Sequence, residues 1–400
     1  MRLFDDAMFQ MFAERALTTI NGGGAEWGEC ALTAERIFEG DADSWYEEWA
    51  ATATMVRGWA EESDRAGHRV SAREAYLRAS TYYRVSYYPL FGAPVDPRLI
   101  DAAARERASF ARFAELSDPP LVPVRVPFEG TYLDGYLCPA RGTAAEHGPR
   151  PTVIAVNGYD SNVHEMYWAH ARPACRRGYH CLLVDGPGQG LALVGQGLTM
   201  RPDWENVLRP VIDHAVTLPG VDAERLAVIG WSFGGFLAPR GVSGDRRVAA
   251  LVADPGQWDQ LENIRGILPL PGELKERLPD VDPAELEPHL RPLVRSAVMR
   301  WRLVRRGLWV HGLHSLGEYV VELDRYRLSD VVADISCPTL ITTSDGDPTA
   351  AGAQKLYEAL DCPKLLVRFT AAEGAQGHCE SWNRSRYEQR VFDWLDEVLN

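Results

Sequence analysis

The sequence predicts an α/β fold: a mostly parallel sheet with helices on both faces, a helical domain ahead of it and a helical insertion within it. After about residue 122, short and almost wholly apolar runs alternate with stretches compatible with helix. Such runs are typical of parallel strands, because both faces of the sheet are buried. Before residue 118, apolar residues recur every three or four positions, which is the period of a helix.

The N-terminal segment, 1–118, is therefore expected to form a helical domain. Its stretch "SWYEEWAATATMVRGWAEE" places Trp45, Trp49 and Trp59 on one helical face. No convincing fixed repeat period connects its helices, so we expect a helical companion domain and not a repeat array. The following "SDPPLVP" breaks the pattern and is typical of a linker.

The remainder, 122–400, is expected to hold the sheet. It opens with a predicted hairpin, "VPVRVPFEGTYLDGYLCP". Most of the later apolar runs end in glycine, aspartate or asparagine, and ligands of parallel sheets bind beyond the carboxyl ends of the strands. Between "VADPG" and "PTLITT", residues 257–336 are too many for one crossover. We expect them to form a helical cap over the active edge of the sheet.

Composition excludes several classes of protein. The net charge of −14 and the absence of a basic stripe argue against nucleic-acid binding. The seven cysteines are scattered without a CxxC pair, so neither a disulfide framework nor a metal site is expected, and a reducing compartment fits. The N-terminus lacks a signal peptide's features, and no apolar run approaches the roughly 18 residues of a membrane span. We expect a soluble, cytoplasmic protein without contact to a membrane.

The most informative motif is "GWSFG", which places Ser232 in a G-x-S-x-G pattern. It follows the predicted strand "RLAVI" and precedes a predicted helix. A sharp strand-to-helix turn of this kind exposes the serine hydroxyl above the sheet, and flanking glycines are needed because side chains there would collide with neighbouring elements. The pattern predicts that Ser232 is a nucleophile, with Trp231 beside it as a candidate substrate contact.

A serine hydroxyl needs a base, and His378 stands where one is expected. It lies in "FTAAEGAQGHCE", after the last predicted strand and before the C-terminal helix, in the chain order Ser, acid, His. The acid that orients it is predicted to be Asp347 in "ITTSDGDPT". Asp345 is expected to be a turn residue, and Asp254 in "VADPG" is the alternative acid.

The oxyanion of an acyl-transfer reaction needs two N–H donors. One is expected to be the backbone N–H of Phe233, directly after the nucleophile. The other is expected from the loop "NGYD" after the first parallel strand, through Tyr159. Trp258, at the start of the insertion, is a second candidate to line the substrate pocket.

Together, "VNGYDSN", "DGPGQG", "GWSFGG" and "EGAQGHCE" resemble the α/β-hydrolase superfamily across about Val122 to Asn400. The long helical N-terminus narrows the resemblance to a group with FrsA-like esterases, yellowish-green-type polyketide-shortening hydrolases and the C–C hydrolase of 2,6-dihydroxypseudooxynicotine. This resemblance implies a triad of Ser232, Asp347 and His378. It also implies a homodimer and no cofactor.

The predicted function is a serine hydrolase acting on a bulky aromatic or polyketide-like small molecule, in secondary metabolism or catabolism. The triad serves C–C cleavage as well as ester or thioester cleavage, so the sequence leaves the bond open. Acyl transfer or cyclisation on the same triad is an alternative. A non-catalytic ligand receptor on a hydrolase fold is an alternative of another class, which the complete triad disfavours.

Overall fold

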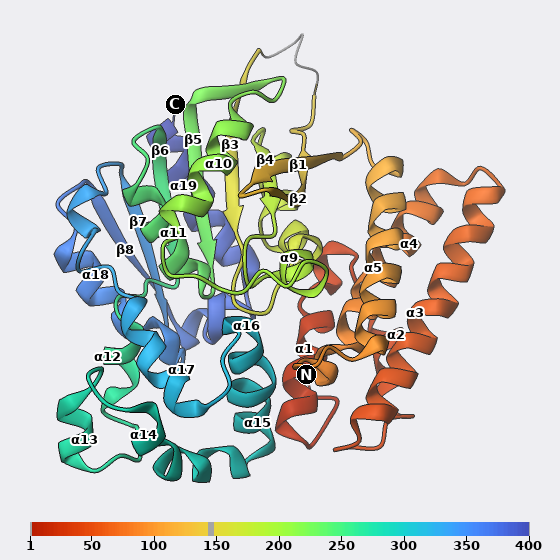
Figure 1. Ribbon diagram of the computed structural model, residues 1–400. Helices are drawn as coiled ribbons and strands as arrows, with labels where there is room; N and C mark the ends of the chain where they lie inside the picture. Colours follow the sequence, from red (N-terminus) through yellow and green to blue (C-terminus); the bar gives the residue numbers. More distant parts are fainter. Residues whose placement is uncertain (1, 143–147, 400) are drawn as a thin grey trace. The chain divides into compact units, whose positions relative to one another are not determined.

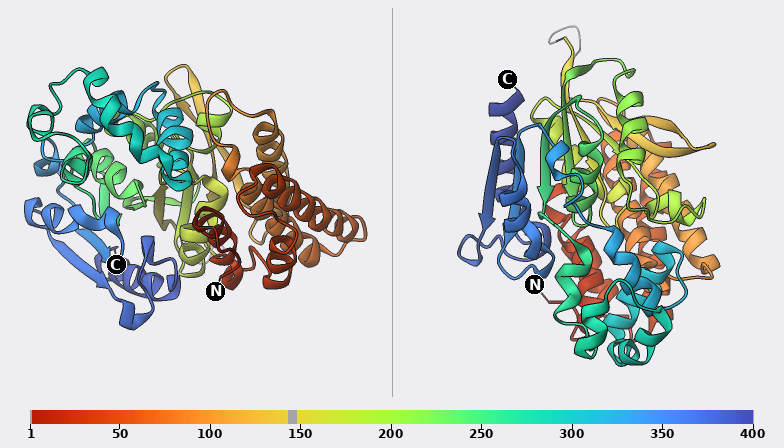
Figure 2. Two further views of the ribbon diagram at one scale, coloured as in Figure 1. Left: turned by 90° about the horizontal axis from the view of Figure 1, so that it is seen from below. Right: turned by 60° about the vertical axis from the view of Figure 1, so that its left-hand side comes forward.

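The structure is a computed structural model that describes residues 2–142 and 148–399 (Figures 1 and 2). The chain forms two compact units. The first comprises Met1–Val122 and Pro292–Trp309, and the second comprises Pro123–Arg291 and Val310–Asn400. Within the described residues, no helix is both long enough and apolar enough to cross a membrane.

The first unit is helical and contains the red to orange ribbons of Figure 1. Trp45 and Trp49 of its longest helix are fully buried, whereas Trp59 is 45% exposed. Ala60 is fully buried, so the buried face continues past Trp59, which itself points away from it. Asp41 caps this helix: its side chain accepts hydrogen bonds from the backbone N–H groups of Asp43 and Ser44. The elements of this part are α1 (Ala7–Leu17), η1 (Ile20–Gly22), α2 (Trp27–Ala34), α3 (Ala42–Arg65), α4 (Arg69–Ser86), η2 (Tyr88–Leu90) and α5 (Pro97–Leu116).

The segment Pro292–Trp309 lies inside the predicted cap range but belongs to the first unit. It contains α15 (Ala297–Arg300) and the π-helical η5 (Trp301–Leu308). The Trp301 indole N–H donates to the carbonyl of Tyr88 at 2.7 Å, and its ring lies 4.9 Å from that of Phe12. This buried indole explains why the segment packs with the N-terminal helices, a long-range contact that hydrophobic periodicity does not reveal.

The second unit is built on one eight-stranded sheet in the order β1-β2-β4-β3-β5-β6-β7-β8. Strand β2 runs antiparallel to β4, and the neighbours from β4 to β8 are parallel. The predicted hairpin is confirmed as β1 and β2, joined at Glu129 and Gly130, both with positive φ. The strands are β1 (Val122–Phe128), β2 (Thr131–Cys138), β3 (Arg150–Val156), β4 (His180–Val184), β5 (Val221–Trp231), β6 (Val248–Asp254), β7 (Thr339–Ser344) and β8 (Lys364–Phe369).

Helices cover both faces of this sheet, so the predicted fold class is confirmed (Figure 1). On one face lie α10 (Glu205–Ala215) and α11 (Gly234–Ser243). On the other lie η3 (Tyr167–Ala171), α8 (Arg172–Arg176) and α19 (Arg384–Leu399). The shorter helices are α7 (Val163–Met166), α9 (Gly190–Val194) and α18 (Ala353–Ala359).

The insertion between β6 and β7 is helical. The part of it that lies in the second unit positions two side chains, His311 and Tyr326, near the end of β5. Its elements in that unit are α12 (Gln260–Arg265), α13 (Gly272–Arg277), α14 (Pro283–Leu290), α17 (Leu316–Glu322), η6 (Leu323–Arg325) and η7 (Val332–Asp334).

Candidate active site

The turn after β5 has the sharp geometry that the sequence predicts. Ser232 has φ 59°, a left-handed conformation that is strained for a residue with a side chain, and α11 begins two residues later. A Cβ atom at Gly230 would collide with the carbonyl of Gly234, and one at Gly234 would collide with the carbonyl of Val156. Both glycines are therefore required for the chain to reverse here and expose the serine.

Ser232, His378 and Asp347 lie in one hydrogen-bonded chain. Ser232 Oγ is 2.7 Å from His378 Nε2, and His378 Nδ1 is 2.9 Å from Asp347 Oδ2. An ionised carboxylate only accepts, so the proton of a neutral imidazole resides on Nδ1. The lone pair of Nε2 then faces the serine hydroxyl. The arrangement can remove a proton from Ser232.

Asp347 is held on its other oxygen by Thr349. The backbone N–H and the hydroxyl of Thr349 both donate to Asp347 Oδ1, at 2.9 and 2.7 Å. The carboxylate side chain is fully buried. Burial acts to raise the pKa of Asp347, but the hydrogen bonds from His378 and Thr349 outweigh it and keep this pKa below its usual value. The acid is therefore ionised and fixed in orientation.

Asp254, the alternative acid, has other partners. Its carboxylate accepts from the hydroxyl of Thr342 at 2.9 Å and from Arg384 Nη1 at 3.3 Å. Its backbone carbonyl accepts from the N–H of Ser232 at 2.6 Å, so Asp254 does touch the nucleophile turn. Asp347 is the aspartate whose carboxylate meets the imidazole. Asp345, the predicted turn residue, forms an ion pair with Arg368, whose Nη2 lies 2.7 Å from Asp345 Oδ1.

The loop after β3 approaches the nucleophile closely, as the oxyanion prediction requires. A Cβ atom at Gly158 would lie 2.8 Å from the Cβ of Ser232 and 3.3 Å from its Oγ. The next residue is Tyr159, whose ring lies 5.2 Å from that of Phe233. Phe233 immediately precedes α11, where backbone N–H groups have no partner within the helix.

Two glutamines that the sequence reasoning missed brace these backbones. Gln189 Nε2 donates to the carbonyl of Asn157 at 2.8 Å, and Gln257 Nε2 donates to the carbonyl of Ser232 at 2.6 Å. Asp185 accepts from Asn157 Nδ2 at 2.5 Å. Gln189 and Asp185 belong to "DGPGQG", which contributed only to the resemblance. Only their position at the carboxyl end of β4, beside β3, signalled this role.

The role of the two tryptophans in lining the pocket stays a prediction. The Trp231 ring lies 6.1 Å from that of the fully buried His170, and the backbone of Trp258 packs against Gly352. Further aromatic rings beside the turn are those of Phe233 and its neighbours. Phe233 lies 5.7 Å from Tyr326, Tyr159 lies 5.5 Å from His311, and the Tyr326 hydroxyl is 3.1 Å from His311 Nδ1.

In the described ranges, no group of three or more His, Cys, Asp or Glu side chains could hold a metal ion. The chemistry that these residues themselves offer is nucleophilic attack by a serine, with an imidazole to move the proton.

Comparison with known proteins gives consistent matches. The sequence model described as "Esterase FrsA-like" matches residues 36–254, and that of the "Alpha/beta hydrolase family" matches residues 153–394. The chain is 33% identical to "Hydrolase acrC" of Aspergillus aculeatus, with 96% of this chain and 94% of that protein covered. It is also 33% identical to "20-hydroxy-prefusarin hydrolase FUS2" of Gibberella moniliformis, with 100% and 98% covered.

Among solved structures, that of a 2,6-dihydroxy-pseudo-oxynicotine hydrolase aligns with a TM-score of 0.75. The alignment covers 96% of this chain and 95% of that one at 22% sequence identity, which shows a shared fold.

Proposed function

The chain belongs to the α/β-hydrolase family, and within it to the FrsA-like esterases, and from that premise we propose that it is a serine hydrolase of a bulky aromatic or polyketide-like carbonyl compound. The observation that carries this proposal is the chain of hydrogen bonds from Ser232 through His378 to Asp347, at 2.7 and 2.9 Å. A receptor would have no need of these hydrogen bonds, so they support an enzyme over a non-catalytic binding protein.

In the proposed reaction, Ser232 Oγ attacks the substrate carbonyl while His378 Nε2 takes the hydroxyl proton. Asp347 stays ionised and stabilises the imidazolium. The N–H groups of Tyr159 and Phe233 receive the oxyanion. His378 then gives its proton to the departing group, and a water molecule hydrolyses the acyl-enzyme by the same steps.

The same steps serve C–O, C–S and C–C bonds. For a ketone, the bond between the carbonyl carbon and its neighbour breaks, and the electron pair leaves with the neighbouring carbon. That carbon becomes an enol when a second carbonyl or a phenol ring stabilises the charge, and His378 supplies its proton. The rings of Phe233, Tyr159 and Tyr326 offer apolar and aromatic surface beside the nucleophile, which supports such a substrate.

The relatives support a small-molecule substrate. A relative covered over almost its whole length is named for hydrolysing 20-hydroxy-prefusarin. Acyl transfer or cyclisation would use the same acyl-enzyme with a different acceptor. The homodimer and the cytoplasmic location stay predictions, and sedimentation velocity on the purified chain will measure the first.

The proposal is tested by capture with a fluorophosphonate, followed by peptide mapping. We expect one adduct per chain, on Ser232, and no adduct in Ser232→Ala. Ser243→Ala, at the far end of α11, is the matched control and should react like the wild type. Capture at another residue, or equal capture in Ser232→Ala, would remove Ser232 as the nucleophile.

The bond is tested with a matched pair of substrates, an aryl ester and an aryl β-diketone that share one acyl group. Both should leave the same acyl mass on Ser232. Turnover of the diketone indicates C–C cleavage, and turnover of the ester alone restricts the enzyme to esters. A long-chain lipid ester that outperforms both would contradict the proposed substrate class.

A further inference from the structure

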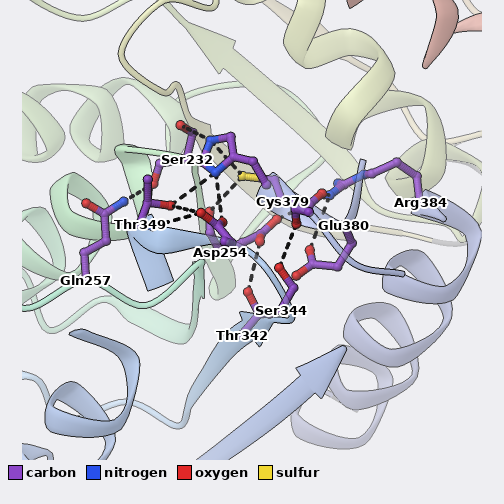
Figure 3. Close-up of polar contacts among 12 residues, drawn as sticks. Ser232, Asp254, Gln257, Thr342, Ser344, Thr349, Cys379, Glu380 and Arg384 are labelled. Atoms are coloured by element: carbon purple, nitrogen blue, oxygen red, sulfur yellow. Dashed lines mark hydrogen bonds and ion pairs between the residues drawn. The ribbon is translucent and has the colours of Figure 1, made fainter. Parts of the chain in front are cut away.

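Three ionisable side chains that the proposed triad does not use form a cluster behind His378. Asp254 and Glu380 are both 0% exposed. Arg384 Nη1 lies 3.3 Å from Asp254 Oδ2 and 3.9 Å from Glu380 Oε2 (Figure 3). The first contact is a hydrogen-bonded ion pair, and the second is too long for a hydrogen bond.

The charges of this cluster do not balance if both acids are ionised. Two carboxylates would face one guanidinium, and an uncompensated buried charge is strongly unfavourable. Arg384 holds the two carboxyl groups close together, because its Nη1 lies within 4.0 Å of an oxygen of each. Two carboxyl groups hydrogen-bond only when one of them carries a proton. In the described part of the chain, no N–H or O–H donor reaches either oxygen of Glu380, so Glu380 is the site for that proton.

The surroundings of Glu380 favour its neutral form. Burial, and then the negative charge of Asp254, raise the pKa of Glu380 well above its usual value. Burial, and then the charge of Arg384, hold the pKa of His170 well below its usual value, so its ring is neutral. Arg384 thus supplies the positive charge of the cluster. The other titratable groups that face Glu380 are Asp347, Cys379 and Tyr387.

The same cluster holds the turn that carries His378. Cys379 and Glu380 have φ values of 52° and 49°, a left-handed conformation that non-glycine residues rarely adopt. Arg384 Nη1 donates to the carbonyl of Cys379 at 2.9 Å, and its Nη2 donates to the carbonyl of Ala169 at 3.1 Å. Arg384 therefore fixes the strained turn to the η3 segment.

Asp254 connects this turn to the nucleophile. Its backbone carbonyl accepts the N–H of Ser232 at 2.6 Å and lies 3.7 Å from the sulfur of Cys379. Its side chain is bound by Thr342 and Arg384. One residue thus contacts the turn that carries the serine and the turn that carries the imidazole.

We propose that Glu380 is a positioning residue: it carries a proton shared with Asp254, and the Asp254–Glu380 pair with Arg384 locks the turn that aims His378 at Ser232. This inference rests on the proposed role of Ser232 as nucleophile. It assigns to Asp254 a structural partnership with Glu380 in place of the role of catalytic acid.

The test compares Glu380→Gln with Glu380→Ala by the rate of fluorophosphonate capture at Ser232 and by kcat and KM. Glutamine has the shape of a protonated glutamic acid and can donate to Asp254, so it should stay within about threefold of the wild type at pH 7. Alanine should lower the capture rate and kcat about 100-fold with little change in KM, because the imidazole is misplaced. Glu397→Gln, an exposed position on α19, is the matched control and should change nothing.

The pH profile separates this role from a merely structural one. Capture by the wild type should decline at alkaline pH as Glu380 loses its proton, whereas Glu380→Gln should lack that decline. In the folded chain Glu380 keeps its proton above the usual glutamate pKa of about 4.3, so its contribution to stability is full below that pH and falls as pH rises toward the raised pKa. The unfolding equilibrium constant of the wild type relative to Glu380→Gln should therefore rise about tenfold per pH unit in that window.

Wild-type capture rates in folded Glu380→Ala would overturn the proposal. If that variant does not fold, identical alkaline limbs in the wild type and Glu380→Gln would overturn it. A wild type that is not captured at Ser232 at all would defeat the proposed function, and the pH dependence of unfolding would still report whether the buried proton exists.

Discussion

Two buried aspartates stand at the carboxyl ends of neighbouring strands, Asp254 as the last residue of β6 and Asp347 shortly after β7. Asp347 meets an imidazole and the donors of Thr349. Asp254 meets the guanidinium of Arg384, which also contacts the carboxyl group of Glu380. The same residue type on the same sheet edge thus has two different roles. Asp347 orients the base itself, and Asp254 fixes the turn that carries the base. The partners of an acid, and not its place on the sheet, decide what it does.

The largest expected effect comes from Asp347→Asn. The amide cannot accept the Nδ1 proton as a carboxylate does, so the imidazole loses its orientation and its stabilising charge. We expect kcat to fall about 10,000-fold with the fold retained, as in other serine triads. Steady-state kinetics and circular dichroism check the two parts. A loss of kcat below tenfold would show that Asp347 does not orient the base.

The next effect is on stability. Arg384→Met removes the cation and leaves Asp254 as an unpaired buried charge, which should lower the free energy of unfolding by about 3–5 kcal/mol. Denaturant unfolding measures it. Arg368→Met is the matched control, because Arg368 is 71% exposed in its pair with Asp345 and its loss should leave stability nearly unchanged. Equal effects of the two substitutions would contradict a structural role for the buried pair.

Asp254→Asn should have a smaller effect on catalysis. The amide still accepts from Thr342, and Glu380 can then ionise and pair with Arg384. We expect kcat to fall about tenfold, or about 1.4 kcal/mol in activation free energy. The ratio of the kcat losses in Asp347→Asn and Asp254→Asn measures how much more the base depends on Asp347. A ratio below one would make Asp254 the catalytic acid.

The smallest effect is expected from Thr349→Val. It removes the hydroxyl bond to Asp347 but keeps the backbone N–H bond. The loss of one such bond should lower kcat/KM about threefold. Thr343→Val, on β7, is the matched control. A loss as large as that of Asp347→Asn would show that the hydroxyl, and not the carboxylate alone, holds the imidazole.

Local patterns predicted much of this molecule. The run "RLAVI" before G-x-S-x-G sufficed for β5 and the turn at Ser232, because strand, glycines and helix start are adjacent in the chain. The order Ser, acid, His selected Asp347 and His378, which the structure places in hydrogen-bonding contact. These features depend on short-range backbone geometry.

What the sequence did not predict depends on contacts between distant residues. Arg384 lies 130 positions from Asp254, and nothing near either residue indicates the pair. Cys379 and Glu380 adopt a left-handed conformation without being glycines, so nothing in the sequence signals it. Segment Pro292–Trp309 reads as part of the insertion, and only the buried contacts of Trp301 place it with the first unit.

The central claim is that Asp347, and not Asp254, orients the base. It is tested most directly by nitrogen-15 NMR of histidine-labelled protein, which observes the Nδ1 proton of His378. We expect this hydrogen-bonded proton to be seen in the wild type and in Asp254→Asn and to be lost in Asp347→Asn. Its loss in Asp254→Asn with retention in Asp347→Asn would make Asp254 the residue that orients the base.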